Sequence, residues 1–321
     1  GGAQQHGSVY MHGRSDALLR SMDPARPAGD LAAEMLSRDV APLWMDASAG
    51  EEAREIEQAV GGAAALATRT GSRGFSRFSA AQIRRFWKRE PERYARTSHV
   101  HLVSSFLASL LAGAHAPLDP GDASGTNLMD LIGRRWWTPA VEAAAPHLLA
   151  KLPPIVASST VYGVLAPYWQ ARHGFPAVPL VVWTGDNQAS LVGSGLVEPG
   201  QVGISLGTSD TIFGPIAEAA VDAAGAGHVY GAPTGAFMAL TCFANGSLAR
   251  EFVRFEQGVD WNRFAALLAG PVGNDGYVML PWLETETTPP VARPGLRRFG
   301  FDRSDPGRNV RAVIEGQMMA M

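Results

Sequence analysis

The stretch Leu180-Val-Val-Trp-Thr-Gly-Asp-Asn187 carries the most information about the fold. Its apolar first half, bounded by Pro179 and Gly185, is typical of a buried strand in a mixed or parallel sheet. Small residues follow at 189–196, so we expect a helix to start directly after the strand. Ligands of open α/β sheets bind beyond the carboxyl ends of the strands. Asp186 and Asn187 are therefore predicted to face a ligand site.

Asp186 has two possible roles at such a strand-to-helix turn. A carboxylate held at a helix N-terminus could take a proton from a substrate hydroxyl, while Asn187 hydrogen-bonds a neighbouring hydroxyl. Aspartate is also a common N-cap residue, which would make its role structural. The spacing alone leaves both interpretations open.

A second informative stretch is Ser205-Leu-Gly-Thr-Ser-Asp-Thr211, which lies between two β-rich runs at 202–206 and 211–213. This pattern predicts a hairpin. A glycine followed by hydroxyl residues exposes backbone N–H groups and side-chain donors, and such a nest can bind a phosphate without a lysine. A plain hairpin turn would have the same sequence pattern.

Composition excludes several classes of protein. The 321 residues are 46% hydrophobic with a formal net charge of −3, a balance that disfavours a general nucleic-acid binder. No apolar run approaches the length of about 18 residues that a membrane-spanning helix needs. Cys242 is the only cysteine, so a disulfide framework and a cysteine-rich zinc module are excluded. These features predict a soluble, cytoplasmic protein.

The phosphate-binding loop of P-loop proteins is also absent, because it needs Gly-Lys-Ser/Thr. The only lysines are Lys88 and Lys151, and neither follows a glycine. His99 and His101 have the spacing of a metal-binding pair, but no third ligand lies near them in the sequence. We therefore predict no metal site.

The remaining pattern gives a coarse map of the chain. A capping box of Ser79 and Gln82 predicts the start of a helix over 79–89, and Ser304-Asp305-Pro306 predicts the start of a C-terminal helix. Further helices are expected at 102–111 and 247–255, surface loops at 217–227 and 288–298, and a domain boundary at 198–200.

Four motifs, in their order and spacing, resemble the FGGY family of carbohydrate kinases, and within it the xylulose kinases. They are Gln4-Gln-His-Gly7, Asp122-Ala-Ser-Gly-Thr-Asn-Leu-Met-Asp130, Thr184-Gly-Asp-Asn187 and Ser205-Leu-Gly-Thr-Ser-Asp-Thr211. The match is extended by Trp44-Met-Asp46, Thr70-Gly-Ser-Arg73 through Arg77-Phe78, Asn245-Gly-Ser-Leu248 and Arg311-Ala-Val-Ile-Glu-Gly316.

The resemblance implies an α/β protein with the actin-like (ribonuclease H-like, ASKHA) two-domain fold of sugar kinases. Residues 1–198 would form the sugar-binding domain and 199–321 the nucleotide-binding domain, both incomplete. Family members carry an acidic Gly-Thr hairpin before the first of these motifs and a glycine-rich adenosine loop after the last. We therefore expect a chain truncated at both ends, which alone is not a competent kinase.

The resemblance also assigns roles to individual residues. Asp186 matches the catalytic base of the family, and His6, Arg77 and Asn187 match sugar-contacting positions. The ATP site would include Gly207, Thr208, Ser209 and Trp261, of which the first three match the phosphate loop.

The implied reaction is phosphorylation of D-xylulose at its 5-hydroxyl by ATP with Mg²⁺, whose protein ligands are expected outside this chain. D-xylulose and ATP are the only partners that the resemblance implies. Two alternatives remain: an FGGY kinase for another ketose or polyol, and a non-catalytic sugar-binding paralogue. A chaperone-like ATPase of the same superfamily is disfavoured, because Gln5-His6 and Gly185-Asp186-Asn187 match the sugar-kinase pattern.

Overall fold

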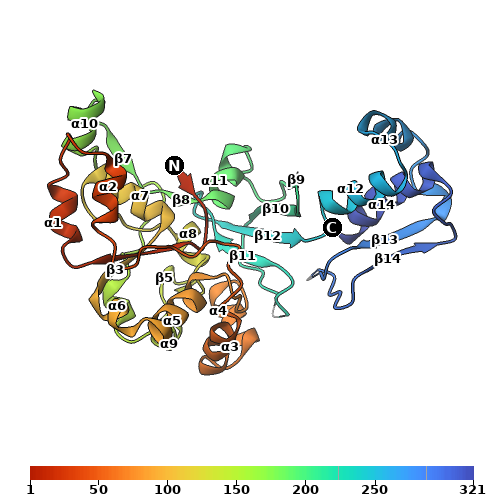
Figure 1. Ribbon diagram of the computed structural model, residues 1–321. Coiled ribbons are helices and arrows are strands. Elements are labelled where there is room, and N and C mark those ends of the chain that lie inside the picture. The colour runs from red at the N-terminus through yellow and green to blue at the C-terminus, as the bar shows by residue number, and fades with distance from the viewer. Residues whose placement is uncertain (223, 287) are drawn as a thin grey trace. The chain divides into compact units, whose positions relative to one another are not determined.

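The structure is a computed structural model that describes residues 1–222, 224–286 and 288–321. Figure 1 shows its helices and strands. The chain divides into two compact units, and each is described by itself. Unit 1 contains residues 1–201 and 214–239, and unit 2 contains residues 202–213 and 240–321. No helix among the described residues has both the length and the apolar character needed to cross a membrane.

Most of the helices belong to unit 1. They are α1 (Ser15–Arg20), α2 (Ala28–Ala33), α3 (Gly50–Ala59), α4 (Ala63–Thr70), α5 (Ser79–Arg89), α6 (Pro91–Arg96), α7 (Val103–Ala112), α8 (Pro120–Ser124), α9 (Thr138–Ala144), the 3₁₀ turn η1 (Leu148–Lys151), α10 (Pro167–His173) and α11 (Asp186–Gly193). The strands of unit 1 are β1 (Gly2–Ala3), β2 (Ser8–His12), β3 (Thr97–Leu102), β4 (Met129–Asp130), β5 (Arg135–Trp136), β6 (Val161–Val164), β7 (Pro179–Val181), β8 (Thr184–Gly185) and β11 (His228–Gly231).

Unit 2 contains β9 (Gly203–Leu206), α12 (Ser247–Glu256), α13 (Trp261–Leu268), the 3₁₀ turn η2 (Asn274–Gly276), β13 (Val278–Trp282), β14 (Gly295–Phe299) and α14 (Pro306–Ala320). Two strands, β10 (Asp210–Ile216) and β12 (Phe237–Phe243), begin in one unit and end in the other.

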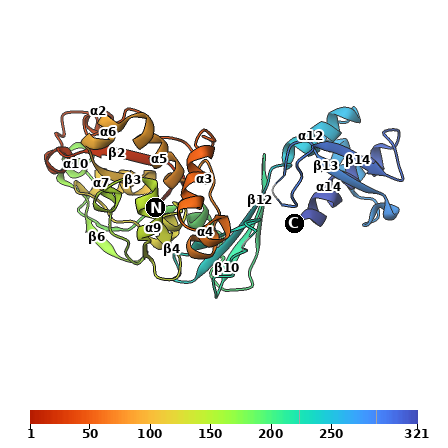
Figure 2. The ribbon, with the colours of Figure 1, turned by 90° about the horizontal axis from the view of Figure 1, so that it is seen from below.

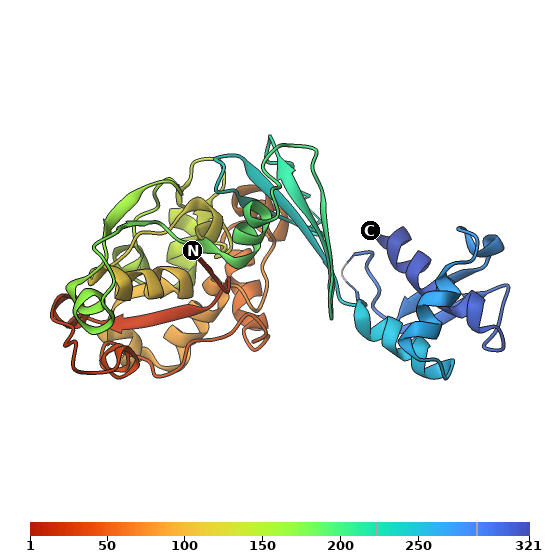
Figure 3. The same ribbon diagram turned by 90° about the horizontal axis from the view of Figure 1, so that it is seen from above.

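The core of unit 1 forms around the antiparallel pair β2 and β3, in which Ser8 lies opposite Leu102. Helix α5 contacts β2 and α6 contacts β3, as Figure 2 shows, and α7 runs beside β2 in Figure 3. Tyr10 from β2, Phe86 from α5 and Val100 from β3 share one buried apolar cluster. Burial of this cluster contributes to the driving force for folding of unit 1.

The expected helix over 79–89 is confirmed as α5, but the capping box at its start is wrong. Phe78 is the N-cap residue and makes no side-chain cap. The Ser79 hydroxyl instead donates to the His6 carbonyl at 2.9 Å, and the Gln82 amide donates to the carbonyls of Asp46 and Ser76. The two side chains that would otherwise cap the helix therefore donate hydrogen bonds to carbonyls outside it.

The expected buried strand at 180–183 is divided between two short strands. β7 pairs antiparallel with β6, and β8 pairs parallel with β1. Past the end of β7, the Val182 N–H donates to the Thr160 carbonyl at 3.0 Å, which extends the first pairing by one residue before β8 begins. Val181 is 44% exposed, so the run is buried only in part.

The expected hairpin is present. β9 and β10 pair antiparallel with Leu206 opposite Asp210, and they form one edge of the sheet β11-β12-β10-β9. The segment 217–227, which we expected to be a surface loop, connects β10 to β11. Residues 217–222 and 224–227 form no helix or strand, and residue 223 lies outside the described residues.

The prediction assigned all of residues 199–321 to a second domain, whereas 214–239 packs with unit 1. The reason is the docking of β11. The Val229 N–H donates to the Gly71 carbonyl at 2.8 Å, and the Gly231 N–H donates to the Ser124 hydroxyl at 3.0 Å. Gly71 has φ +88°, and a Cβ there would lie 1.9 Å from the Val229 carbonyl oxygen, so only glycine allows this contact.

Unit 2 is organised by α14, which lies against β13 with α12 beside it (Figure 1). Val253, Phe264, Met279, Val310 and Val313 form its buried core. The prediction of a helix start at 304–306 is confirmed, because Asp305 caps α14 by accepting from the Arg308 N–H. The expected loop at 288–298 is partly wrong, since Gly295–Phe299 forms β14 and pairs with β13.

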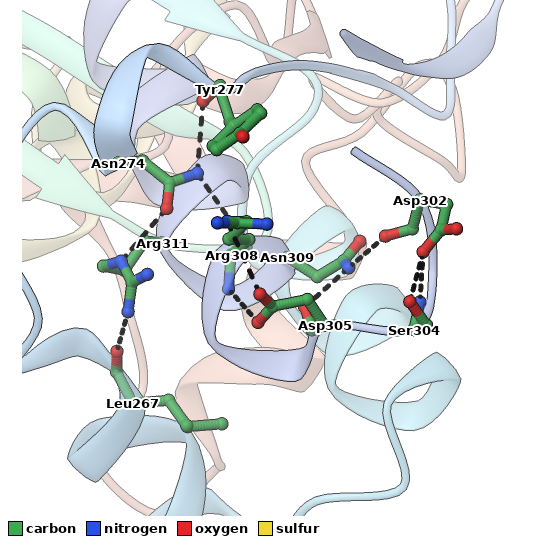
Figure 4. A network of polar contacts seen from close by, with 9 residues as sticks. All are labelled: Leu267, Asn274, Tyr277, Asp302, Ser304, Asp305, Arg308, Asn309 and Arg311. Atoms are coloured by element: carbon green, nitrogen blue, oxygen red, sulfur yellow. Dashed lines mark hydrogen bonds and ion pairs between the residues drawn. The ribbon is translucent and has the colours of Figure 1, made fainter. Parts of the chain in front are cut away.

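Figure 4 shows a polar network that fixes the start of α14. The Asn274 amide donates to the carbonyls of Tyr277 and Arg308, and its oxygen accepts from Arg311. Arg311 also donates to the Leu267 carbonyl at the end of α13. These contacts tie η2 and α13 to one face of α14.

A buried ion pair ties the 207–210 turn to two helices of unit 2. Arg250 on α12 binds both carboxylate oxygens of Asp210, at 2.7 and 2.9 Å. The same guanidinium donates to the Gly207 carbonyl and to Gln317 on α14. Gln317 in turn donates to the carbonyls of Asn245 and Gly246.

We expect Arg250→Met to lower the stability of unit 2 by about 3–5 kcal/mol, because it leaves the buried Asp210 carboxylate without its counter-ion. Hydrogen exchange of peptides from α12 and α14, read by mass spectrometry, measures this loss locally. Arg263→Met on the exposed face of α13 is the matched control and should change exchange little.

The double variant Arg250→Met/Asp210→Asn should lose less than the sum of the two single variants, because it removes both charges together. Equal exchange in wild type and Arg250→Met would contradict this role for the pair.

Candidate functional site

The first candidate site lies in unit 1, where three segments far apart in sequence meet. The parallel pair β1–β8 sets Ala3 opposite Gly185. The segments that follow the two strands therefore start side by side. One is Gln4–Gly7, and the other is the start of α11. The short helix α8 completes the group, because its Gly121 carbonyl accepts from the side chains of both Gln5 and Gln188.

Asp186 is the first residue of α11, and Gly185 occupies the N-cap position. The N-cap interpretation of Asp186 is therefore wrong. Its carboxylate accepts from the Asn187 N–H at 2.8 Å, and the side chain is otherwise exposed. Desolvation by the surrounding atoms still raises the pKa of this carboxyl above its ordinary value, against the backbone N–H groups that lower it.

Asn187 lies next to the candidate base. Its amide donates to the carboxylate of Asp186 at 3.2 Å and to the Gln5 carbonyl oxygen at 3.3 Å. Gln5 is buried and packs so closely on α8 that a Cβ on Gly125 would lie 2.4 Å from its amide nitrogen. Asp186 and Asn187 are thus positioned by a rigid, buried neighbour.

His6 has a left-handed backbone, with φ 71°, which non-glycine residues seldom adopt. The strain persists because the ring is held on two sides. Nδ1–H donates to the Gly125 carbonyl at 2.6 Å, and the ring stacks on Phe78 with centroids 4.1 Å apart. Burial lowers the pKa of His6 to about 3. The ring is therefore neutral, and its Nε2 is a hydrogen-bond acceptor.

Arg77 lies over the Phe75 ring at 5.5 Å, and Arg73 lies over the same ring at 5.1 Å. Neither arginine forms an ion pair among the residues that the structure describes. Phe75 in turn packs on Phe78, with centroids 5.3 Å apart. The predicted residues His6 and Arg77 are thus joined through an aromatic cluster, and the positive charge of Arg77 contributes to the lowered pKa of His6.

The sequence analysis missed His228, which comes from β11. Its ring contacts Phe75 and Phe78 and stacks on Tyr230, and its Nδ1 lies 3.0 Å from the Ser72 hydroxyl. Burial lowers the pKa of His228 to about 3. No motif surrounds this histidine, so only the docking of β11 on the Gly71 loop could have revealed it.

Two buried carboxyl groups support the site from behind. Asp119 caps α8 by accepting from the Asp122 N–H at 2.8 Å, and it also accepts from Ser158. The Asp122 carboxylate accepts from Ser104. Burial raises the pKa of both carboxyl groups. The hydrogen bonds of Asp119 and of one Asp122 oxygen fix α8, and with it the Gly121 carbonyl that orients Gln5, while the other Asp122 oxygen is buried without a hydrogen-bond partner among the described residues.

The second candidate site is the Gly207-Thr208-Ser209 turn in unit 2. The Ser247 N–H donates to the Gly207 carbonyl at 2.7 Å, and the Gly207 N–H donates to Asp210 at 3.2 Å. Thr208 and Ser209 are exposed. A Cβ on Gly246 would lie 2.6 Å from the Thr208 carbonyl oxygen, so α12 starts directly beneath the turn. The carbonyls of Gly207 and Thr208 face the start of α12, whereas the side chains of Thr208 and Ser209 are exposed.

Trp261 begins α13, which Asp260 caps. Its side chain is 51% exposed and lies under the Arg254 guanidinium, 4.9 Å from the ring centre. In the described part of unit 2, the ring contacts of Trp261 are with Arg254 and Phe264, and no hydrogen bond joins it to the 207–209 turn. Its role therefore stays a prediction.

A family model and several known proteins match this chain. The N-terminal domain of the FGGY family of carbohydrate kinases matches residues 37–193. The xylulose kinase of Rattus norvegicus is 40% identical over 336 aligned residues, which cover 100% of this chain and 61% of that protein. The chain thus spans about three fifths of the length of the curated relatives it matches.

Solved structures show the same fold. The xylulose kinase of Bifidobacterium adolescentis matches with a TM-score of 0.81 at 24% identity, covering 99% of this chain and 67% of that one. A glycerol kinase from Plasmodium falciparum, solved with ADP, matches with a TM-score of 0.78 at 15% identity, covering 99% and 61%. The expected actin-like sugar-kinase fold is confirmed, and residues 37–193 are similar to the N-terminal domain of the FGGY family of carbohydrate kinases.

Proposed function

We propose that the protein transfers the γ-phosphoryl group of ATP to the 5-hydroxyl of D-xylulose, giving D-xylulose 5-phosphate and ADP. The placement of Asp186 carries the proposal: an exposed carboxylate with a raised pKa, at the start of α11 and beside Asn187. The relatives at 40% and 38% identity are xylulose kinases, which supports this choice of sugar.

In the proposed reaction, the Asp186 carboxylate takes the proton of the sugar hydroxyl as its oxygen attacks the γ-phosphorus. The bond between that phosphorus and the bridging oxygen breaks, and ADP leaves. Such transfers depend on positioning and charge stabilisation. Asn187, the neutral Nε2 of His6 and the guanidinium of Arg77 would orient the sugar by hydrogen bonds.

ATP would bind unit 2 through its phosphates. The Gly207-Thr208-Ser209 turn offers two exposed hydroxyls above a rigid base, which is the donor set that a phosphate needs without a lysine. Mg²⁺ would accompany ATP, whose phosphates supply part of its coordination shell. Trp261 would lie against the nucleotide, a role that its exposed ring permits.

The choice of sugar is tested in the protein extended to the length of its curated relatives, because this chain alone is not expected to turn over. The panel is D-xylulose, D-ribulose and glycerol, with calorimetry for binding and ADP release for turnover. D-xylulose should give the highest kcat/KM. Faster turnover of D-ribulose or glycerol would replace the substrate and leave the kinase assignment intact. Binding of D-xylulose without any phosphoryl transfer would instead support the sugar-binding paralogue.

Asp186→Asn should reduce kcat by about 10²- to 10⁴-fold, the usual contribution of a general base. The KM for the sugar should change little, because the carboxamide keeps the shape of the side chain. Asp30→Asn, an exposed acidic residue in the first turn of α2, is the matched control. Undiminished turnover in Asp186→Asn would refute the assigned base.

The pH profile gives a second reading of the same group. Only the deprotonated carboxylate can accept a proton, so kcat/KM should fall as the pH drops through the pKa of Asp186. Because that pKa is raised, the acidic limb should lie above the ordinary aspartate value of about 3.9. In Asp186→Asn, the kcat/KM of any residual activity should not show this fall at acidic pH.

Thr208→Val and Ser209→Ala should each weaken ATP binding by about tenfold or more, since each removes a hydrogen bond to a charged phosphate. Calorimetry with ATP measures this loss, and D-xylulose binding should be unchanged. Thr234→Val, in an exposed turn of unit 1, is the control. If both variants bound ATP as wild type does, the turn would not be the phosphate site.

A further inference from the structure

Three potential metal ligands converge in unit 1, and none of them belongs to the site described above. Asp16 lies on α1, His99 on β3, and His115 in the segment between α7 and α8. One ligand atom from each lies within 4.8 Å of the other two. The sequence analysis found no third ligand beside the pair His99 and His101; the fold supplies Asp16 and His115 from distant segments.

The two histidines face the same carboxylate. Nε2 of His99 lies 3.9 Å from one oxygen of Asp16, and Nε2 of His115 lies 3.8 Å from the other. The two rings stack with centroids 3.7 Å apart. Two imidazole nitrogens and one carboxylate form a donor set that divalent transition metals prefer.

A chain of hydrogen bonds joins His115 to His101 and Ser105, and its direction decides which nitrogen of His115 carries the lone pair. With the Ser105 hydroxyl donating to the Leu102 carbonyl at 3.2 Å, Nδ1–H of His101 donates to Ser105 at 3.0 Å. Nε2 of His101 is then the acceptor for Nδ1–H of His115, at 2.9 Å. The lone pair of His115 is therefore on Nε2, which faces Asp16.

This arrangement has the form of a metal site with its supporting residues. A histidine that binds a metal usually donates its other ring N–H to a fixed acceptor, which sets its tautomer and orientation. His101 is 1% exposed and provides that acceptor.

Two further observations fit an ion at this position. Nδ1 of His99 is buried and has no hydrogen-bond partner among the described residues, so hydrogen bonds do not fully fix this ring. The site is also open to solvent, because the side chains of Asp16, His99 and His115 are 45%, 29% and 15% exposed. An ion can therefore reach the three ligands, and water can complete its coordination.

Binding requires a small rearrangement. Metal–ligand bonds of about 2.0–2.2 Å bring ligand atoms closer together than the present spacing, so the stacked rings must turn until both lone pairs point at the ion. The Ser15 hydroxyl lies 3.2 Å from Nε2 of His115 and would be displaced. Arg20, 3.9 Å from Asp16, would lose that partner. Both changes involve short side-chain movements.

We propose that Asp16, His99 and His115 bind a divalent transition-metal ion of the zinc class, with water in the remaining positions. The ion would link α1, β3 and the segment before α8, three parts of unit 1 that the sequence separates widely. This site is independent of the proposed kinase activity, and its test uses no kinase assay.

The 321-residue chain is first stripped with a chelator and then titrated with Zn²⁺ in a calorimeter, and with Co²⁺ while the visible absorption is recorded. We expect one ion per chain and a cobalt spectrum typical of mixed nitrogen and oxygen ligands. Zn²⁺ should raise the melting temperature, because it binds the folded state. Excess Mg²⁺ should not compete, since it prefers oxygen ligands.

Asp16→Asn and His99→Gln should each weaken Zn²⁺ binding by at least about tenfold, since loss of a ligand should cost no less than loss of an outer-shell partner. His147→Asn is the control: the residue is exposed, and asparagine tolerates its positive φ of 57°. Circular dichroism checks the fold, and the half-exposed Asp16 remains decisive if His99→Gln does not fold.

Absence of saturable Zn²⁺ and Co²⁺ binding would overturn the proposal. So would wild-type affinity in Asp16→Asn, or displacement of Zn²⁺ by Mg²⁺.

Discussion

The ion pair between Arg250 and Asp210 is the interaction on which the geometry of unit 2 depends. Both side chains are nearly buried, so neither charge can remain there without the other. The guanidinium also donates hydrogen bonds to the Gly207 carbonyl and to the Gln317 side chain. One cation therefore fixes the 207–210 turn, the start of α12 and the end of α14.

In unit 1, neutral groups and close backbone packing hold the candidate site in place instead of an ion pair. Its candidate sugar site rests on Gln5, which is held between the Gly121 carbonyl and the Asn187 amide. The strained backbone of His6 is maintained by the Gly125 carbonyl and the Phe78 ring. Groups that would meet a ligand are thus preorganised, which limits the conformational freedom lost on binding.

Local sequence signals predicted the regular elements well and the long-range partners poorly. The helices α5 and α12 were placed correctly, and the Ser304-Asp305-Pro306 signal placed the start of α14, where Asp305 caps the helix. The capping box failed because Ser79 and Gln82 bond to distant carbonyls. β14 was missed since its exposed arginine-rich run gains its strand character only from pairing with β13.

The candidate site shows the same division. Asp186, Asn187 and His6 could be found from short motifs, but His228 belongs to no motif and reaches the cluster only through β11. Asp16 and His115 are 99 positions apart in the chain, so their approach to a shared point follows from the packing of α1 against the segment between α7 and α8.

The chain passes between the two units at three places, after residues 201, 213 and 239. Neither unit is therefore encoded by one continuous stretch. A ribosome that has just made residue 201 has not yet made β11, so the cluster around Phe75 still lacks His228 and Tyr230. Unit 1 can reach its final packing only after the first strand of unit 2 has been synthesised, which couples the folding of the two units in time.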